Sequence, residues 1–258
     1  MDLGLSDRVY VVTGASRGVG RACAEQLAAE GARLVLCGRD EETLGKTAAA
    51  LGGPERAIAV TGDLSQPGIE TCLAAAAVAR YGRLDGVLIS LGNPPPSTAL
   101  DTDDGAWRLA YESSFLAPMR LARTIGKMAG NEGVSLLFVL SPSVKEPVSG
   151  RAMSNGLQPG LAMAAKTLAE ELGPRNVRVN VLLPGQIDRA GQFDTRGRED
   201  TAGQRSEEQR REEEARIPLR RLGEALEFAR PAVFLLSPAA SYVTGTTLTV
   251  DGGASRSF

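Results

Sequence analysis

Three glycines near the N-terminus could bring a phosphate group against the backbone. Residues 13–20 read Thr-Gly-Ala-Ser-Arg-Gly-Val-Gly and lie between an apolar run at 9–12 and an amphipathic segment. A backbone without Cβ atoms can approach a pyrophosphate closely, and the first turn of a helix offers free N–H groups and a positive dipole end. The same spacing also fits an ordinary strand–helix turn. The flanking patterns favour dinucleotide binding by Gly14, Ser16, Arg17, Gly18, Val19 and Gly20.

The end of the second apolar run indicates which dinucleotide is bound. The run at 33–37 is followed by Gly38 and Arg39, with Asp40 one position later. In nucleotide-binding folds an acidic residue here holds the 2′-hydroxyl of NAD, whereas an arginine pairs with the 2′-phosphate of NADP. Arg39 is closer to the strand end than Asp40, and Arg17 adds a second cation. NADP(H) is therefore favoured over NAD(H).

Composition excludes several classes of protein. The 258 residues carry a formal net charge of −2, which argues against a nucleic-acid partner. No apolar run reaches the ~20 residues of a membrane span, and no signal segment begins the chain, so we expect a cytoplasmic protein without a membrane partner. Cys23, Cys37 and Cys72 lack metal-ligand spacing and are expected to be reduced thiols. The chain has no histidine, and no metal site is predicted.

Short β-rich apolar runs alternate with helical patterns along the whole chain. This alternation predicts an α/β fold, a single Rossmann-like, doubly wound parallel sheet of about seven strands with helices on both faces, in one domain over 1–258. Strands are expected near 8–13, 33–37, 57–61, 85–91, 134–141, 177–183 and 246–250. Helices are expected near 18–30, 40–51, 66–80, 103–129, 158–173 and 224–236.

One segment departs from this alternation. Residues 189–216 are polar, and 196–216 carry six arginines against seven acidic residues. A solvated helix with ion pairs four residues apart explains this composition. The segment directly follows a strand end at Pro184-Gly185, so it also fits a lid over a substrate cleft. The two interpretations are compatible, because the outer face of a lid must be solvated.

A series of short motifs follows the predicted strands and helices along the chain. They are Thr13 to Gly20, Asp63-Leu64, Leu84-Asp85, Trp107, Val179-Asn180-Val181, Pro184-Gly185, Tyr242 to Gly245 and Val250 to Gly253. The order of these motifs resembles the short-chain dehydrogenase/reductase (SDR) family over essentially the whole chain. In detail the chain looks most like the branch related to 3-oxoacyl-carrier-protein reductases. Within that branch, residues 92–96, 144–147 and 154–155 resemble a subgroup that lacks the usual active-site residues.

The resemblance assigns the catalytic positions, and most of them differ from the family pattern. The family's Tyr-x-x-x-Lys falls on Ser154 and Gln158, its helix asparagine on Ser114, and its catalytic serine on Ser141. Only Ser141 is retained. The cofactor contacts that the resemblance implies are Asp63 and Leu64 beside the adenine, Gly92, and the segment of Pro184, Gly185, Ile187 and Asp188 near the nicotinamide, where Asp188 replaces a threonine.

Loss of the tyrosine removes the family's proton donor. A serine beside a neutral glutamine cannot be tuned to donate a proton near neutral pH, and general acid–base catalysis contributes ~10²–10⁴ in rate, or about 3–5 kcal/mol of barrier. Lys145, four residues after Ser141, is the best alternative proton source, and the competing interpretation is a solvated loop lysine in an exposed ion pair with Glu146. Pro159 and nearby glycines predict that the helix begins late, near Gln158, or is kinked.

Three functions remain open. The first is an NADP(H)-dependent oxidoreductase acting on a small carbonyl or alcohol. The second is a non-catalytic, cofactor-binding subunit, and the third is non-redox chemistry such as dehydration or isomerisation in the same pocket. Met153, Leu183, Ile187 and Phe193 either line an apolar pocket or belong to the core. The resemblance also implies a homotetramer, or a hetero-oligomer with an active paralogue.

Overall fold

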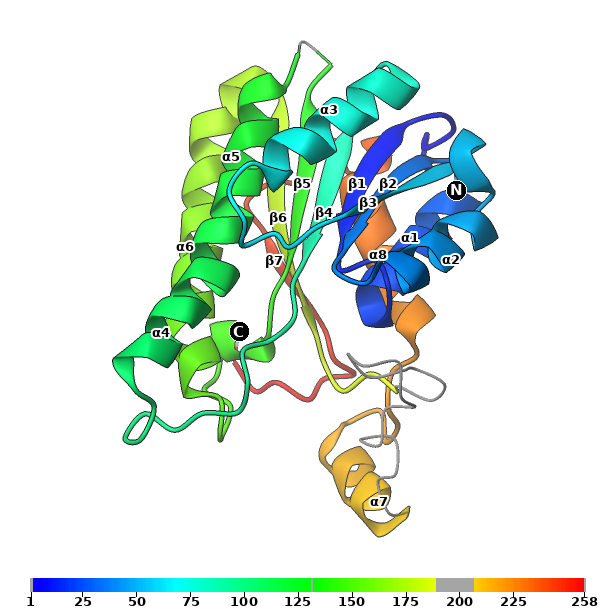
Figure 1. Cartoon of the computed structure of the whole chain (residues 1–258). Coiled ribbons are helices and arrows are strands. Elements are labelled where there is room, and N and C mark those ends of the chain that lie inside the picture. The colour runs from blue at the N-terminus through cyan, green and yellow to red at the C-terminus, as the bar shows by residue number, and fades with distance from the viewer. Residues whose placement is uncertain (1, 131, 189–206, 258) are drawn as a thin grey trace.

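The computed structural model describes residues 2–130, 132–188 and 207–257, and its centre is a seven-stranded sheet (Figure 1). The strands follow the order β3-β2-β1-β4-β5-β6-β7, and every neighbouring pair is parallel. The predicted fold class and all seven predicted strands are confirmed. The strand bounds are β1 Val9–Thr13, β2 Arg33–Gly38, β3 Ala57–Thr61, β4 Gly86–Ser90, β5 Val134–Val139, β6 Val177–Pro184 and β7 Thr247–Val250.

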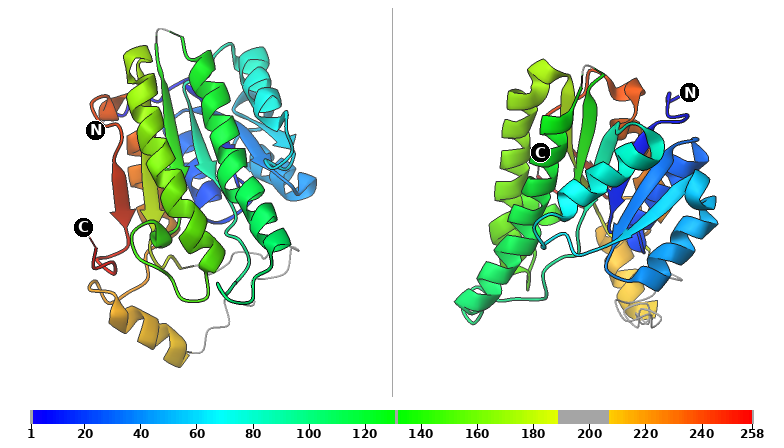
Figure 2. Two further views of the ribbon diagram at one scale, coloured as in Figure 1. Left: turned by 90° about the vertical axis from the view of Figure 1, so that its left-hand side faces the viewer. Right: turned by 45° about the horizontal axis from the view of Figure 1, so that its top comes forward.

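Helices cover both faces of the sheet (Figure 2). One face packs against α3 (Ile69–Tyr81), α5 (Ala117–Met128) and α6 (Ala152–Leu172). The other face packs against α1 (Gly18–Ala29), α2 (Glu41–Ala50) and α8 (Ala225–Leu236). Because both faces are covered, the central strands are buried along their whole length, as in β1, β4 and β5.

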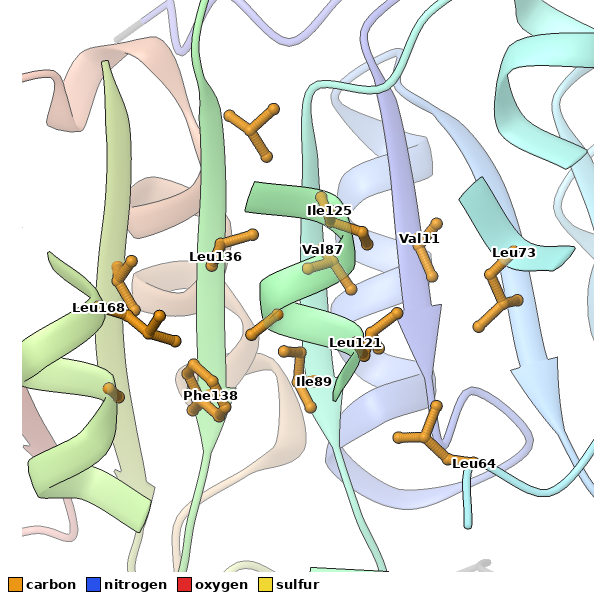
Figure 3. Packing of buried hydrophobic residues seen from close by; sticks show 14 of the residues in the cluster. Val11, Leu64, Leu73, Val87, Ile89, Leu121, Ile125, Leu136, Phe138 and Leu168 are labelled. Carbon is orange, nitrogen blue, oxygen red and sulfur yellow. The ribbon is translucent and has the colours of Figure 1, made fainter. Parts of the chain in front are cut away.

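The core on the α5 side joins strands and helices that are far apart in sequence (Figure 3). Phe138 and Leu136 of β5 pack in one cluster with Leu121 and Ile125 of α5 and with Leu168 of α6. All of these side chains are buried. Burial of each contributes roughly 1.5–3 kcal/mol relative to an exposed position, so this cluster fixes α5 and α6 against the strand ends that carry the site.

The long helix predicted over 103–129 is present as a continuous helical stretch with one irregular turn. It consists of α4 (Asp104–Tyr111), a π-helical turn at Glu112–Leu116, and α5. Ser114 lies in the π turn and is buried. π turns widen a helix by one residue and occur frequently at functional sites.

The prediction of a late start for the next helix is wrong, because α6 begins at Ala152. Two of its first backbone N–H groups have a partner in a distant loop. Ala152 N donates to the Ser97 carbonyl at 3.1 Å, and Met153 N donates to the Ser97 hydroxyl at 3.1 Å. These bonds satisfy donors that a helix start leaves free. Pro159 stands inside the helix.

Glycine at 156, which also suggested a broken helix, has a packing role instead. A Cβ atom there would lie 3.0 Å from the Trp107 ring of α4. The small residue therefore allows α4 to approach α6 closely, and the helix continues through it.

Candidate active site

The crevice expected in such a sheet lies where the strand order reverses, between the carboxyl ends of β1 and β4. Thr13, at the end of β1, joins these two strands, since its hydroxyl donates to the Ser90 carbonyl at 2.8 Å and accepts from Ser90 N at 2.9 Å. Gly14 follows with φ +62°, and a Cβ there would lie 2.8 Å from the Ser90 carbonyl oxygen. A side chain at Gly20 would overlap the Gly14 carbonyl. Both positions therefore require glycine.

The N-terminus of α1 is open toward this crevice. Its N-cap residue is Arg17, which makes no side-chain capping bond, and the first turn holds no acidic residue. The free N–H groups and the positive dipole end are therefore available to an anion. Ser16 reaches across to the end of β2, because a Cβ at Gly38 would lie 2.5 Å from the Ser16 hydroxyl.

Charges at the ends of β2 and β3 are arranged around Arg39, which is exposed. The carboxylate of Asp40 accepts from Thr43 N at 2.7 Å and caps α2, and this bond lowers the pKa of Asp40. Asp63 accepts from the backbone and hydroxyl of Ser65 at 2.9 and 2.8 Å, and the backbone bond, helped by the Arg39 charge, lowers the pKa of Asp63. Asp40 is thus engaged with its own helix, whereas the Arg39 guanidinium makes no ion pair with a described residue.

The positions of the lost Tyr and Lys lie on one side of α6, four residues apart and both buried. The Gln158 amide joins three segments. Its oxygen accepts from Ser141 N, in the turn after β5, and its nitrogen donates to Asn93 Oδ1 at 3.4 Å, in the loop after β4. The structure therefore brings Ser141 and Gln158 together. Asn93 was not predicted as a contact, and its place directly after Gly92 was the only local signal.

Two buried hydroxyls near this point have no hydrogen-bond partner. Ser154 is 2% exposed and Ser143 is 4% exposed, and the oxygen of each is unpaired. Ser143 lies in the short 3₁₀ turn Pro142–Val144, which packs against α6. A buried hydroxyl without a partner costs about 1–3 kcal/mol, and a water or a polar group of a ligand would satisfy these two hydroxyls.

Lys145 follows this turn, and its expected pairing with Glu146 is wrong. Glu146 Oε1 accepts from Arg256 N at 2.7 Å and from Ser257 N at 2.6 Å, and these two bonds lower the pKa of Glu146. Lys145 is half-buried and makes no ion pair with a described residue. The acid thus binds the C-terminal segment, which lies 110 residues away in sequence.

The segment after β6 runs along the same edge of the sheet. Pro184 ends the strand, and a Cβ at Gly185 would overlap Asp251. Ile187 pairs with Gly223 in an isolated bridge, and Asp188 contacts Arg210 of α7 (Glu207–Arg216) at 3.1 Å.

The predicted lid is described only in its second part. Helix α7 extends beyond the strand ends (Figure 1) and carries the expected pairs four residues apart, Arg210–Glu214 at 2.9 Å and Arg211–Glu207 at 3.3 Å. Residues 189–206, with Phe193, lie outside the described residues, and the role as a lid stays a prediction. Of the other pocket candidates, Met153 and Leu183 are core residues.

The described residues contain neither a helix long and apolar enough to cross a membrane nor a group of three metal-binding side chains. The three cysteines are free thiols. The open helix N-terminus and the glycine turn fit the pyrophosphate of a dinucleotide. The sheet order and this crevice define a dinucleotide-binding α/β protein of the Rossmann type.

Comparisons with known proteins identify the family. The family model described as enoyl-(acyl carrier protein) reductase matches residues 14–255. L-rhamnose 1-dehydrogenase (NAD(P)(+)) of Azotobacter vinelandii is 34% identical over 259 residues, covering 96% of this chain and 97% of that protein. Human dehydrogenase/reductase SDR family member 4 is 33% identical over 255 residues, with 96% and 88% covered. The chain belongs to the short-chain dehydrogenase/reductase family.

Solved structures agree with this assignment. L-sorbose reductase from Gluconobacter frateurii, complexed with NADPH and L-sorbose, matches with a TM-score of 0.89 and 29% identity over 100% of both chains. The predicted resemblance to the SDR family is therefore confirmed, and the chain is an SDR-type oxidoreductase by descent. Its assignment to a subgroup without Tyr-x-x-x-Lys stays a prediction.

Proposed function

We propose that this chain is an NADP(H)-binding oxidoreductase that transfers hydride between the cofactor and a small carbonyl or alcohol, with an altered proton-handling site. The observation that carries the proposal is the uncapped N-terminus of α1 behind the Gly14 turn. The pyrophosphate would bind there, and Arg17 and Arg39 would hold the 2′-phosphate. Preference over NAD(H) is supported by Asp40, whose carboxylate is engaged in capping α2.

The remaining cofactor contacts follow the strand ends. Asp63 and Leu64 would border the adenine. Gly92, where a Cβ would have no neighbour within 4 Å, would allow close approach of the ribose. Near the nicotinamide, the contacts would come from Pro184, Gly185, Ile187 and Asp188. The cofactor, when bound, supplies or accepts the hydride.

Ser141 is proposed to orient the substrate. Its hydroxyl oxygen accepts from Ser143 N at 3.2 Å, so the hydroxyl hydrogen is free to donate to a carbonyl oxygen. Gln158, by accepting from Ser141 N, holds this turn in place. Lys145 is the proposed proton source, because it is cationic and makes no ion pair with a described residue. Ser154 and Ser114 would shape the pocket or hold water.

A second candidate function is that of a non-catalytic cofactor-binding subunit. It is supported by the Gln158 amide, which is neutral and engaged on both sides where the family has a charged lysine. In either case we propose a homotetramer. One two-fold interface would use the α4–α5 helix and α6, and the other α8 and β7.

The two candidates are separated by turnover. Binding of NADPH and NADH is measured by fluorescence titration, and NADPH oxidation is followed on a panel of ketones and aldehydes. We expect slow wild-type turnover that falls at least tenfold in Lys145→Ala and is unchanged in the control Lys127→Ala, at the opposite end of the sheet. An active wild type that Lys145→Ala leaves unaffected removes Lys145 from the mechanism.

A double substitution tests the alternative. Ser154→Tyr with Gln158→Lys restores the family's pair on α6. The non-catalytic function is supported if the wild type binds NADPH but reduces no carbonyl, while the double variant does reduce one. If the wild type does not bind NADPH, both candidate functions are contradicted.

A further inference from the structure

Arg120 of α5 joins two segments that are far apart in sequence. Its Nη1 donates to Glu112 Oε1 at 2.6 Å, and its Nη2 donates to the Ser65 carbonyl at 2.8 Å. The side chain is 18% exposed, and its Nε is buried without a partner. Two acceptors from different parts of the chain therefore hold the guanidinium in one orientation.

The first of these segments is the loop after β3, which runs from the strand to α5 (Figure 1). Asp63 accepts from the backbone and the hydroxyl of Ser65, and these bonds fold the loop into a compact turn. Leu64 packs in the same apolar cluster as Leu121 of α5 (Figure 3). Among the described residues, Arg120 is the one side chain outside the loop that forms a hydrogen bond with residues 63–65. It therefore fixes the backbone of the expected adenine-binding loop against α5.

The second segment is the π turn at Glu112–Leu116, between α4 and α5. Glu112 is its first residue, and the buried Ser114 lies within it. A long side chain on a helix points toward the helix N-terminus, so Arg120 reaches back over the turn to an acid eight residues earlier. The ion pair thus bridges the π turn on one side. Ser114 takes the position of the family's helix asparagine, as the resemblance implies, so this turn belongs to the catalytic end of the candidate site.

We propose that Arg120 is a positioning residue that couples the loop at 63–65 to the π turn that carries Ser114. The proposal rests on the cofactor binding of the proposed function. A cofactor that orders the loop also fixes the Ser65 carbonyl, and the guanidinium held there stabilises the turn through Glu112. Coupling between two sites is reciprocal, so a well-ordered turn in return favours the arrangement of the loop that binds adenine. Arg120 itself contacts neither the cofactor nor the substrate in this proposal.

Calorimetry of ADP and NADPH binding to the full chain tests the loop side of this coupling without turnover. ADP carries the adenine, ribose and pyrophosphate that NAD(H) and NADP(H) share, so its affinity does not depend on the preference between them. Arg120→Met should raise the Kd of both ligands about fivefold or more, which corresponds to a loop correctly arranged in at most about a fifth of the molecules. Arg120→Lys keeps the charge and should recover part of the loss. The matched control is Arg123→Met on the same helix, because Arg123 is exposed and makes no hydrogen bond or ion pair with a described residue.

Hydrogen exchange with the same ligands tests the coupling itself. In the wild type, ADP or NADPH should slow exchange of the amides at 112–116 as well as those of the loop, whereas in Arg120→Met only the loop should be protected. Glu112→Ala leaves the contact with Ser65 in place. It should therefore bind ADP more tightly than Arg120→Met does, yet lose the protection of the π turn. Glu112→Gln keeps an oxygen that accepts from Arg120 and should retain this protection. A purely structural role would change exchange in the free protein but not which segments the ligand protects.

The outcomes distinguish this proposal from the proposed function. If Arg120→Met binds ADP and NADPH like the wild type, or if ligand protects residues 112–116 equally in both, the coupling is overturned while cofactor binding stands. If the wild type binds neither ligand, the proposed function and the coupling are both contradicted. If Arg120→Met does not fold, Arg120→Lys and Glu112→Ala decide by the same two measurements, because each keeps one side of the bridge.

Discussion

Among the described residues, Asp85 and Arg178 have several partners at the amino-terminal edge of the sheet, whereas buried hydroxyls near the carboxyl edge, including those of Ser143 and Ser154, have none. At the amino edge Asp85 accepts from Val9 N, Arg8 and Arg83 at 2.6–2.8 Å. There Arg178 donates to carbonyls that end α8 and follow it, at 2.7–3.3 Å. Near the other edge Ser143 and Ser154 are buried without partners. The comparison indicates that the amino edge contributes to stability and the carboxyl edge to binding. A buried hydroxyl without a protein partner is tolerated where a ligand can form the missing hydrogen bond.

The largest effect is expected from breaking the amino edge. Arg178→Met keeps most of the side-chain volume but removes the charged donor from the carbonyls of Leu235, Leu236 and Ser237, which keep only one neutral donor each. We expect the free energy of unfolding to fall by about 2–4 kcal/mol, measured by urea denaturation. The control is Arg175→Met, whose guanidinium bonds carbonyls at the exposed surface and should cost less than about 1 kcal/mol. A similar loss in both variants would contradict the comparison.

Thiol labelling shows whether a reagent can reach side chains below the carboxyl ends of the strands. Burial raises the pKa of Cys37, near the end of β2, to about 11, so its thiolate fraction at pH 8 is about one in a thousand. Cys72 is exposed on α3. We expect a thiol reagent at pH 8 to label the native chain at Cys72 and to reach Cys37 only after unfolding, as read by mass spectrometry. Rapid labelling of Cys37 would mean that the crevice opens below the strand ends.

Cofactor affinity tests the carboxyl edge directly. Arg39→Asp should weaken NADPH binding by about 10–100-fold, or about 1.4–2.8 kcal/mol, and change NADH binding less, because the 2′-phosphate is present only in NADPH. Arg56→Asp makes the same charge change directly before β3, at the amino edge, and serves as the control. Equal losses in the two variants would indicate a general charge effect.

The smallest effect is expected at Ser154. Ser154→Ala removes a buried hydroxyl that has no partner, so the free energy of unfolding should stay the same or rise by up to about 1 kcal/mol. Thermal denaturation without and with NADPH measures it. A loss above 1 kcal/mol would show that the hydroxyl has a partner, such as an ordered water, in the free protein.

The features that sequence could predict are those encoded locally. Apolar runs determine the central strands because these strands are buried on both faces, and the glycines at 14, 18 and 20 show the spacing of a strand–helix turn in the sequence itself. The start of α6 could not be predicted, because the donors of its first turn are satisfied by Ser97, more than fifty residues earlier. Local proline and glycine preferences point to a later start, and the distant contact outweighs them.

The partner of Glu146 shows the same limit within the candidate site. Adjacent charges suggested an ion pair with Lys145, yet the acid accepts from backbone N–H groups near the C-terminus. No residue type identifies such a partner, since every non-proline residue offers the same donor. The fold alone does not establish the roles of Ser141 and Lys145 either, because both roles depend on how a bound substrate is oriented.

Ser97 has a consequence for local motion. One residue contributes both its carbonyl and its hydroxyl to the first turn of α6, and its own N–H to the loop before it. The loop after β4 and the start of α6 then open as one cooperative unit, so the amide hydrogens of Ala152 and Met153 should exchange with solvent together with that of Ser97. A ligand that orders the loop after β4 would slow exchange at the beginning of α6 as well.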